Sequence, residues 1–120
     1  MESVVTDHPT CSWTGASGKM YVYEVHPRHP KLTPNQPGNY IYAKSDQHRR
    51  WVPIYIGQGN LTQRAAVDPR CVECIDAKGV THVHLHVNSD RDDRLAEQKD
   101  LLDNFPQAYI PDGCNEKQNR

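Results

Sequence analysis

The sequence has few apolar residues, and they occur only in short runs. Hydrophobic residues make up 36% of the 120 residues, and the mean hydropathy of -0.85 is low for a globular chain. No run approaches the roughly 20 apolar residues that a membrane-spanning helix needs. A chain of 120 residues is also too short for two ordinary domains. We therefore expect one compact domain with a small core and long polar loops.

The chain also lacks an excess of basic residues and a recognisable export signal. Its formal net charge is -1 and its pI is about 6.6, so any nucleic-acid site must be a local feature. The first residues have neither the basic head nor the apolar segment of a signal peptide. We therefore expect a cytoplasmic protein that is not bound to a membrane. Because the cytosol is reducing, we expect free thiols at Cys11, Cys71, Cys74 and Cys114.

The apolar runs predict the order of secondary structure. Short runs rich in β-branched and aromatic residues predict strands over residues 20–25, 38–44, 51–57 and 80–87. A charged turn at residues 45–50 joins the second and third of these strands into an antiparallel hairpin. Helices are predicted over residues 60–67, 71–78 and 94–102. The last helix follows a weak capping box of Ser89 and Asp92 and stops before Pro106.

The composition divides the chain into three parts. Residues 1–19 mix Ser, Thr, Gly and Pro without periodicity, which predicts a polar N-terminal arm. Residues 20–115 carry the strand and helix patterns and form the predicted domain. Residues 116–120 are polar enough to fray.

Two tyrosine-bearing segments lie on the two strands of the predicted hairpin. They are Asn39-Tyr40-Ile41-Tyr42 and Tyr55-Ile56-Gly57. Together they resemble the two halves of the motif that defines the GIY-YIG nuclease superfamily. The stretch from Gln58 to Arg64 resembles the opening of that family's first helix, and residues 79–84 resemble the third strand of small bacterial members. The helix with Glu97 and the closing Asn115 complete a resemblance that covers residues 20–115.

The resemblance implies a fold and an activity. The implied fold is α/β (α+β), with a small central antiparallel sheet of three strands, an N-terminal edge strand at residues 20–25, and flanking helices. The implied activity is metal-dependent hydrolysis of phosphodiester bonds in DNA, with Mg²⁺ or Mn²⁺ as cofactor. A module of this size can form a homodimer to cut both strands, and it can depend on a partner protein for targeting.

Four residues are the catalytic candidates that the resemblance implies: Tyr40, Tyr55, Arg64 and Glu97. Hydrolysis needs a base for the attacking water, positive charge on the phosphoryl oxygens and a stabilised leaving group. Tyr40 is the candidate base with Tyr55 as its partner, Arg64 contacts the phosphate, and Glu97 holds the metal. The candidates for substrate binding or support of the site are Gly57, Gln58, Lys44, His84 and Asn115. We expect Asn115 to anchor the end of the chain or to orient Glu97.

Departures from the family pattern support a second hypothesis. Gln58 stands where many relatives have lysine, and Asp68 stands where several have histidine or tyrosine. Asn39 replaces the usual aliphatic residue of the first half of the motif. Lys44 or Arg50 can supply the missing positive charge. The alternative is a catalytically weak or inactive nucleic-acid-binding module on the same scaffold.

Histidine and cysteine patterns allow a third hypothesis. His82, His84 and His86 alternate along one strand, so they share a face and can bind a transition metal if their side chains converge. The other interpretation is a polar strand face. Cys71 and Cys74 form a lone CxxC pair, which can be redox-active or half of a metal site. We interpret it as a pair of thiols that packs the helix.

Overall fold

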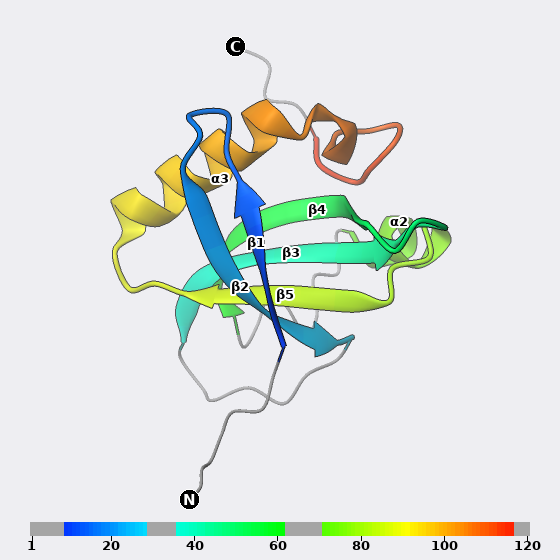
Figure 1. The fold of residues 1–120 in the computed structure, drawn as a ribbon, viewed down its shortest axis with the longest axis horizontal. Coiled ribbons are helices and arrows are strands. Elements are labelled where there is room, and N and C mark those ends of the chain that lie inside the picture. Colours follow the sequence, from blue (N-terminus) through cyan, green and yellow to red (C-terminus); the bar gives the residue numbers. More distant parts are fainter. Residues whose placement is uncertain (1–8, 29–35, 62–70, 117–120) are drawn as a thin grey trace, which may run out of the picture.

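The computed structural model describes residues 9–28, 36–61 and 71–116. These residues form an α+β fold around one five-stranded antiparallel sheet with the order β1-β2-β5-β3-β4 (Figure 1). The strands are β1 Thr10–Thr14, β2 Met20–Pro27, β3 Pro37–Ser45, β4 Trp51–Asn60 and β5 His82–Val87. The helices are α2 Val72–Ala77, α3 Arg91–Asn104 and the short 3-10 helix η1 Pro106–Ala108. The helix predicted over residues 60–67 lies almost wholly outside the described residues.

The predicted hairpin is confirmed as β3 and β4. In the turn between them, the Asp46 carboxylate accepts hydrogen bonds from the backbone N–H groups of His48 at 2.8 Å and Arg50 at 2.9 Å. The pairing register shifts once, so that Tyr42 lies opposite Tyr55 and Ala43 lies opposite Pro53. Proline has no N–H group to donate to a neighbouring strand, which is consistent with an irregularity at this point.

The N-terminal part of the sheet differs from the prediction. Residues 20–25 belong to β2, which lies between β1 and β5 and is not an edge strand. The edge is β1, within the segment that the sequence predicted to be a polar arm. Trp13 explains the difference, because its side chain is only 5% exposed and packs into the core under α3. The turn at Gly15 and Gly18 then returns the chain along β1.

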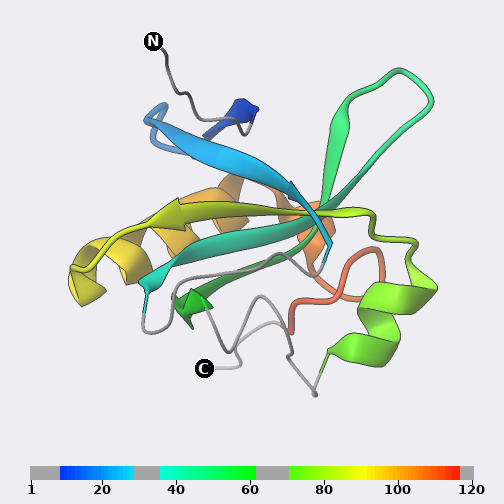
Figure 2. The ribbon, with the colours of Figure 1, turned by 90° about the horizontal axis from the view of Figure 1, so that it is seen from below.

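The two faces of the sheet have separate cores. The α2-side core consists of Tyr40, Tyr42, Ile54, Leu61, Ile75, Val80, Val83, Leu85 and Cys114. The α3-side core consists of Trp13, Tyr23, Ile41, Ala43, Ile56, Leu101 and Ala108. Side chains alternate across a strand, so Tyr40 and Ile41 point to opposite faces. Figure 2 shows α2 beside the returning C-terminal segment, with α3 behind the strands.

Helix α3 begins at Arg91, three residues before the predicted range of 94–102, and its N-cap lies one residue after the predicted Ser89. Asp90 caps it, and its carboxylate accepts a hydrogen bond from the backbone N–H of Asp93 at 3.0 Å. The capping box predicted at Ser89 and Asp92 is therefore placed one residue too early. The observed pair, Asp90 and Asp93, has the same spacing. The helix ends before Pro106, as predicted. Within the described ranges, no helix is long and apolar enough to cross a membrane.

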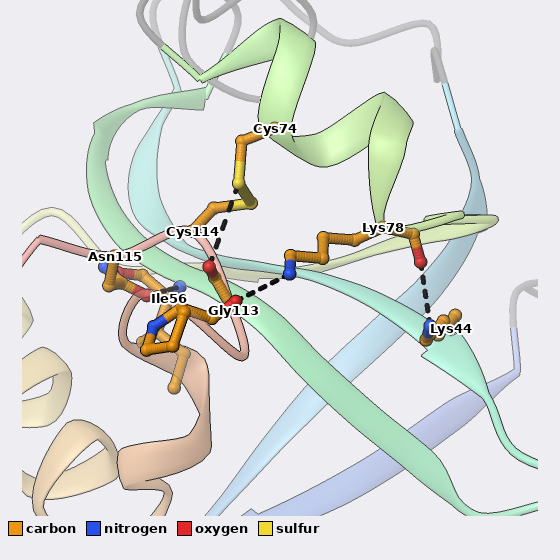
Figure 3. Close-up of a disulfide and its surroundings, with 8 residues drawn as sticks. Lys44, Ile56, Cys74, Lys78, Gly113, Cys114 and Asn115 are labelled. Atoms are coloured by element: carbon orange, nitrogen blue, oxygen red, sulfur yellow. Dashed lines mark hydrogen bonds between the residues drawn. A yellow bond between two sulfur atoms is a disulfide. The ribbon is translucent and has the colours of Figure 1, made fainter.

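The C-terminal segment is tied to α2 by a disulfide bond between Cys74 and Cys114 (Figure 3). The prediction of free thiols is therefore wrong for these two residues, while Cys11 and Cys71 lie outside the disulfide. The two bonded cysteines are 40 residues apart in sequence. They meet because the chain returns along β4, where the Cys114 N–H donates to the Ile54 carbonyl at 2.8 Å. The prediction of free thiols rested on the expected cellular compartment, which says nothing about whether two cysteines lie close together in the fold.

Candidate functional site

Three tyrosines form a cluster on the α2 side of the sheet. The ring centroids of Tyr40 and Tyr55 are 6.0 Å apart, and Tyr42 lies 5.7 Å from Tyr40 and 6.4 Å from Tyr55. The structure thus brings together the two tyrosines that the motif singled out and adds Tyr42. Tyr42 was part of the motif segment, but only the strand register shows that it lies directly opposite Tyr55.

Gly57 leaves space for the Tyr40 ring because it has no side chain. Tyr40 is its partner across the hairpin, and a Cβ atom on Gly57 would come within 2.4 Å of the Tyr40 ring. Real side chains do not approach this closely, so the ring covers a position that only glycine can occupy. This explains in physical terms why a glycine follows Ile56 in β4.

A cleft of about 600 Å³ runs beside β4. Residues of β4, α3, the start of α2 and the C-terminal segment line it, and they include Tyr55, Cys71, Cys74, Gln98, Lys99, Asp103, Tyr109, Cys114, Asn115 and Glu116. Among the described lining residues, Lys99 has the only positive charge, and its ammonium lies 2.8 Å from the Asp103 carboxylate. Hydrogen bonding to Asp103 raises the pKa of Lys99, so its ammonium stays charged.

Asn115 fixes the floor of this cleft. Its side chain is 5% exposed, and its amide accepts from the Ile56 N–H at 2.8 Å and donates to the Ile56 carbonyl at 3.0 Å. The Gln98 amide donates to the same carbonyl at 3.2 Å. Asn115 therefore anchors the C-terminal segment on β4, which is one of the two roles expected for it. The hydrogen bonds of its side chain are to Ile56 and not to Glu97.

Glu97 lies on the other side of the sheet from the tyrosine cluster. Its side chain is 3% exposed. The Tyr23 hydroxyl donates a hydrogen bond to its carboxylate, and Nδ1 of His86 lies 2.9 Å from the same oxygen. Burial, together with the Glu97 charge, raises the pKa of Tyr23 well above its usual value. The structure therefore does not bring Glu97 together with Tyr40 and Tyr55.

The helix geometry explains this separation. Successive residues of an α-helix point about 100° apart, so Glu97 and Gln98 face different surroundings. Glu97 faces the sheet, whereas Gln98 lines the cleft with Tyr55 and Asn115. In the part of the chain that the structure describes, no group of three or more His, Cys, Asp or Glu side chains is placed to hold a metal ion.

The remaining candidates lie apart from one another. Gln58 accepts a hydrogen bond from Nε of Arg94 at 3.1 Å, on the α3 side. Nζ of Lys44 donates to the backbone carbonyl of Lys78 at 2.8 Å, beside α2 (Figure 3). Arg64 and Asp68 lie outside the described residues, so their positions stay predictions.

The three histidines of β5 do not converge on one point, although His82 and His84 both pack against Trp51. His82 packs edge-on against Trp51, with centroids 5.0 Å apart, and His86 contacts Glu97. His84 is fully buried, and its Nδ1 accepts a hydrogen bond from the Trp13 indole at 2.9 Å. Its proton must then be on Nε2, which has no hydrogen-bond partner among the described residues. Burial lowers the pKa of His84 to about 4, so it is neutral at pH 7.

Sequence reasoning missed Tyr23, Trp13 and Gln98. The sequence predicts an edge strand around Tyr23 and a polar arm around Trp13, and no local signal pairs them with Glu97 or His84. Gln98 follows directly after the residue that the motif favoured, and a helical projection of residues 94–102 separates the two. Comparisons of the chain with known protein families, with curated proteins and with solved structures found no match.

Proposed function

We propose that this protein is a nucleic-acid-binding module that has the scaffold of a nuclease but does not hydrolyse phosphodiesters through Glu97. The position of Glu97 carries this proposal. A catalytic metal must contact both its carboxylate ligand and the phosphate. Here the carboxylate is buried against Tyr23 and His86, and the sheet separates it from Tyr40 and Tyr55.

The residue that α3 presents to the cleft supports the same proposal. Gln98 is neutral, and its amide offers Mg²⁺ only one uncharged oxygen. Mg²⁺ sites in nucleic-acid enzymes use one or two carboxylates together with phosphate oxygens. Asp103 and Glu116 also line the cleft, but Asp103 is paired with Lys99. The cleft is therefore better suited to hold a ligand than to assemble a metal centre.

Single-stranded DNA is the ligand that we propose. Tyr55, Tyr109 and Lys99 line the cleft. Stacking of a base on an aromatic side chain contributes about 1–3 kcal/mol and tolerates any sequence. In this proposal Lys99 contacts a phosphate, and Tyr40 and Tyr42 support Tyr55 from within the core. The resemblance alone implies a phosphate contact for Arg64.

Binding is tested by fluorescence anisotropy with single-stranded and duplex oligonucleotides. We expect tighter binding of the single strand and a loss of about tenfold in affinity for Tyr109→Leu, which corresponds to one stacked base. Arg64→Ala weakens binding, whereas Arg91→Ala, an exposed change at the start of α3, is the matched control. The proposal fails if wild-type protein binds neither DNA, or if Tyr109→Leu binds as tightly as wild type.

A metal-dependent endonuclease is the second candidate. The tyrosine cluster favours it, because Tyr40, Tyr42 and Tyr55 lie within 6.4 Å of one another by ring centroid. Plasmid cleavage in Mg²⁺ or Mn²⁺ distinguishes the two candidates. If wild type cuts and folded Glu97→Gln does not, the endonuclease replaces the binding module. If wild type does not cut but Gln98→Glu does, the cleft position of Gln98 accounts for the missing activity.

A further inference from the structure

We propose that Cys71, Cys74 and Cys114 form a thiol–disulfide exchange site in the wall of the cleft. In this exchange, Cys71 displaces Cys114 from Cys74 and forms a disulfide within the CxxC segment. The proposal is independent of the ligand that the cleft binds. It accounts for a cysteine that lies beside a disulfide without being part of it.

The backbone places Cys71 and Cys74 on the same side of a helical turn. Cys71 caps the N-terminus of α2, and its carbonyl accepts a hydrogen bond from the Ile75 N–H at 2.9 Å. Cys71 has αR backbone angles, and residues three positions apart on a helix are neighbours, so we expect the Cys71 side chain to lie next to that of Cys74. Cys71, Cys74 and Cys114 all line the cleft, and Cys71 and Cys74 pack against the α2-side core that contains Cys114.

The exchange is balanced without an external oxidant or reductant. The Cys71 thiolate attacks Sγ of Cys74, and a new sulfur–sulfur bond forms. The bond from Cys74 to Cys114 breaks, and its electron pair leaves with Cys114 as a thiolate. This thiolate takes up the proton that Cys71 has lost. One disulfide and one thiol exist before and after the reaction.

The exchange changes one wall of the cleft and leaves its floor in place. Without the bond to Cys74, α2 loses its covalent link to the C-terminal segment. The Asn115 amide still holds that segment on β4 through its two hydrogen bonds to Ile56. The hydrogen bond from Lys78 Nζ to the Pro111 carbonyl at 2.6 Å then still links α2 to the C-terminal segment. Because this contact is exposed, we expect α2 to become more mobile.

Cys11 provides an internal control. It lies on the α3 side of the sheet, where it packs against the α3-side core and its sulfur is 3.3 Å from Nδ1 of His84. Burial raises the pKa of its thiol, which lowers the fraction of reactive thiolate. The sheet separates it from the three cysteines of the cleft, so it takes no part in the exchange.

Tryptic peptide mapping distinguishes the two disulfides. Cleavage after Arg70 and Lys78 releases one peptide with both Cys71 and Cys74, and cleavage after Lys99 and Lys117 releases another with Cys114. In the Cys74–Cys114 form the two peptides are cross-linked. After exchange, the first peptide contains an internal disulfide and the second carries an alkylated Cys114. Folded protein purified without reductant is incubated with N-ethylmaleimide, and both products are followed over time.

We expect Cys114 to become alkylated in wild type as the internal Cys71–Cys74 disulfide accumulates. In Cys71→Ser and Cys71→Ala, Cys114 alkylation is slower by at least about tenfold, because the attacking thiolate is absent. Cys11→Ser behaves like wild type, and circular dichroism checks that each variant is folded. Equal rates in wild type and both Cys71 variants overturn the proposal. A Cys71–Cys114 disulfide, or four cysteines that are all alkylated at once, also overturns it.

Discussion

His84 makes the stability of the protein depend on pH below neutrality. Its pKa falls from 6.5 in the unfolded chain to about 4 in the folded protein, mainly because of burial and also because of the charges of His82 and His26. Between these two values the unfolded chain binds more protons than the folded protein. The contribution of His84 to stability is therefore fully present above pH 6.5 and is lost as the pH falls toward 4. The free energy of unfolding contributed by His84 decreases by about 2.5 kcal/mol between pH 7.5 and pH 4.5.

Urea unfolding at several pH values measures this loss. Trp13 and Trp51 both contact the His84 ring, with centroid distances of 5.5 Å and 4.6 Å, so tryptophan fluorescence reports on the same region. In His84→Gln, the amide oxygen can still accept the Trp13 hydrogen bond, but the side chain does not titrate. We expect the variant to lose about 2.5 kcal/mol less than wild type over this pH range.

The comparison isolates His84 because every other titrating group is present in both proteins. His48 is exposed in the turn between β3 and β4, so His48→Gln is the matched control and should keep the wild-type pH dependence. If His84→Gln and wild type show the same pH dependence, His84 does not titrate in the way its burial requires. The account of its environment is then wrong.

Three substitutions test the packing around the site, each by urea unfolding. Glu97→Ala should lower the free energy of unfolding by about 3 kcal/mol, because it leaves buried hydrogen-bonding groups unsatisfied, whereas Gln98→Ala should cost less than about 1 kcal/mol. Asn115→Ala should cost about 2 kcal/mol, because the Ile56 N–H loses its partner and the Ile56 carbonyl keeps only the Gln98 amide. Gly57→Ala should cost about 1–3 kcal/mol, because the added methyl group displaces the Tyr40 ring. A stable Glu97→Ala protein contradicts a structural role for this carboxylate.

The strands and the hairpin were predictable because their signals are local. β-Branched and aromatic runs marked β2, β3, β4 and β5, and the charged turn between β3 and β4 was visible in the sequence. Strand β1 was not predicted, because only Cys11 and Trp13 alternate with polar residues there and the segment is 5 residues long. Its place beside β2 depends on contacts with α3, and these contacts connect residues far apart in sequence.

The candidate site was predicted in part for a similar reason. The register of the hairpin brings Tyr40 and Tyr55 together. The spacing of the two tyrosine segments in the sequence predicts that they lie on adjacent strands. The disulfide and the anchoring of Asn115 arise from the return of the chain along β4, which no short segment encodes. His84 was predicted as a neighbour of the site, but its strand face is occupied by Trp13 and Trp51.

The assignment of Glu97 depends on a single helical position. A sequence motif places a carboxylate on a helix, but a shift of one residue rotates the side chain by about 100°. In this protein, the pairing of β2 with β5 brings Tyr23 and His86 to the place where Glu97 meets the sheet. These two residues contact the Glu97 carboxylate, which would otherwise be available as a ligand for a metal ion. In the function that we propose, the residue of α3 that faces the cleft decides between a nuclease and a binding module, and here that residue is Gln98.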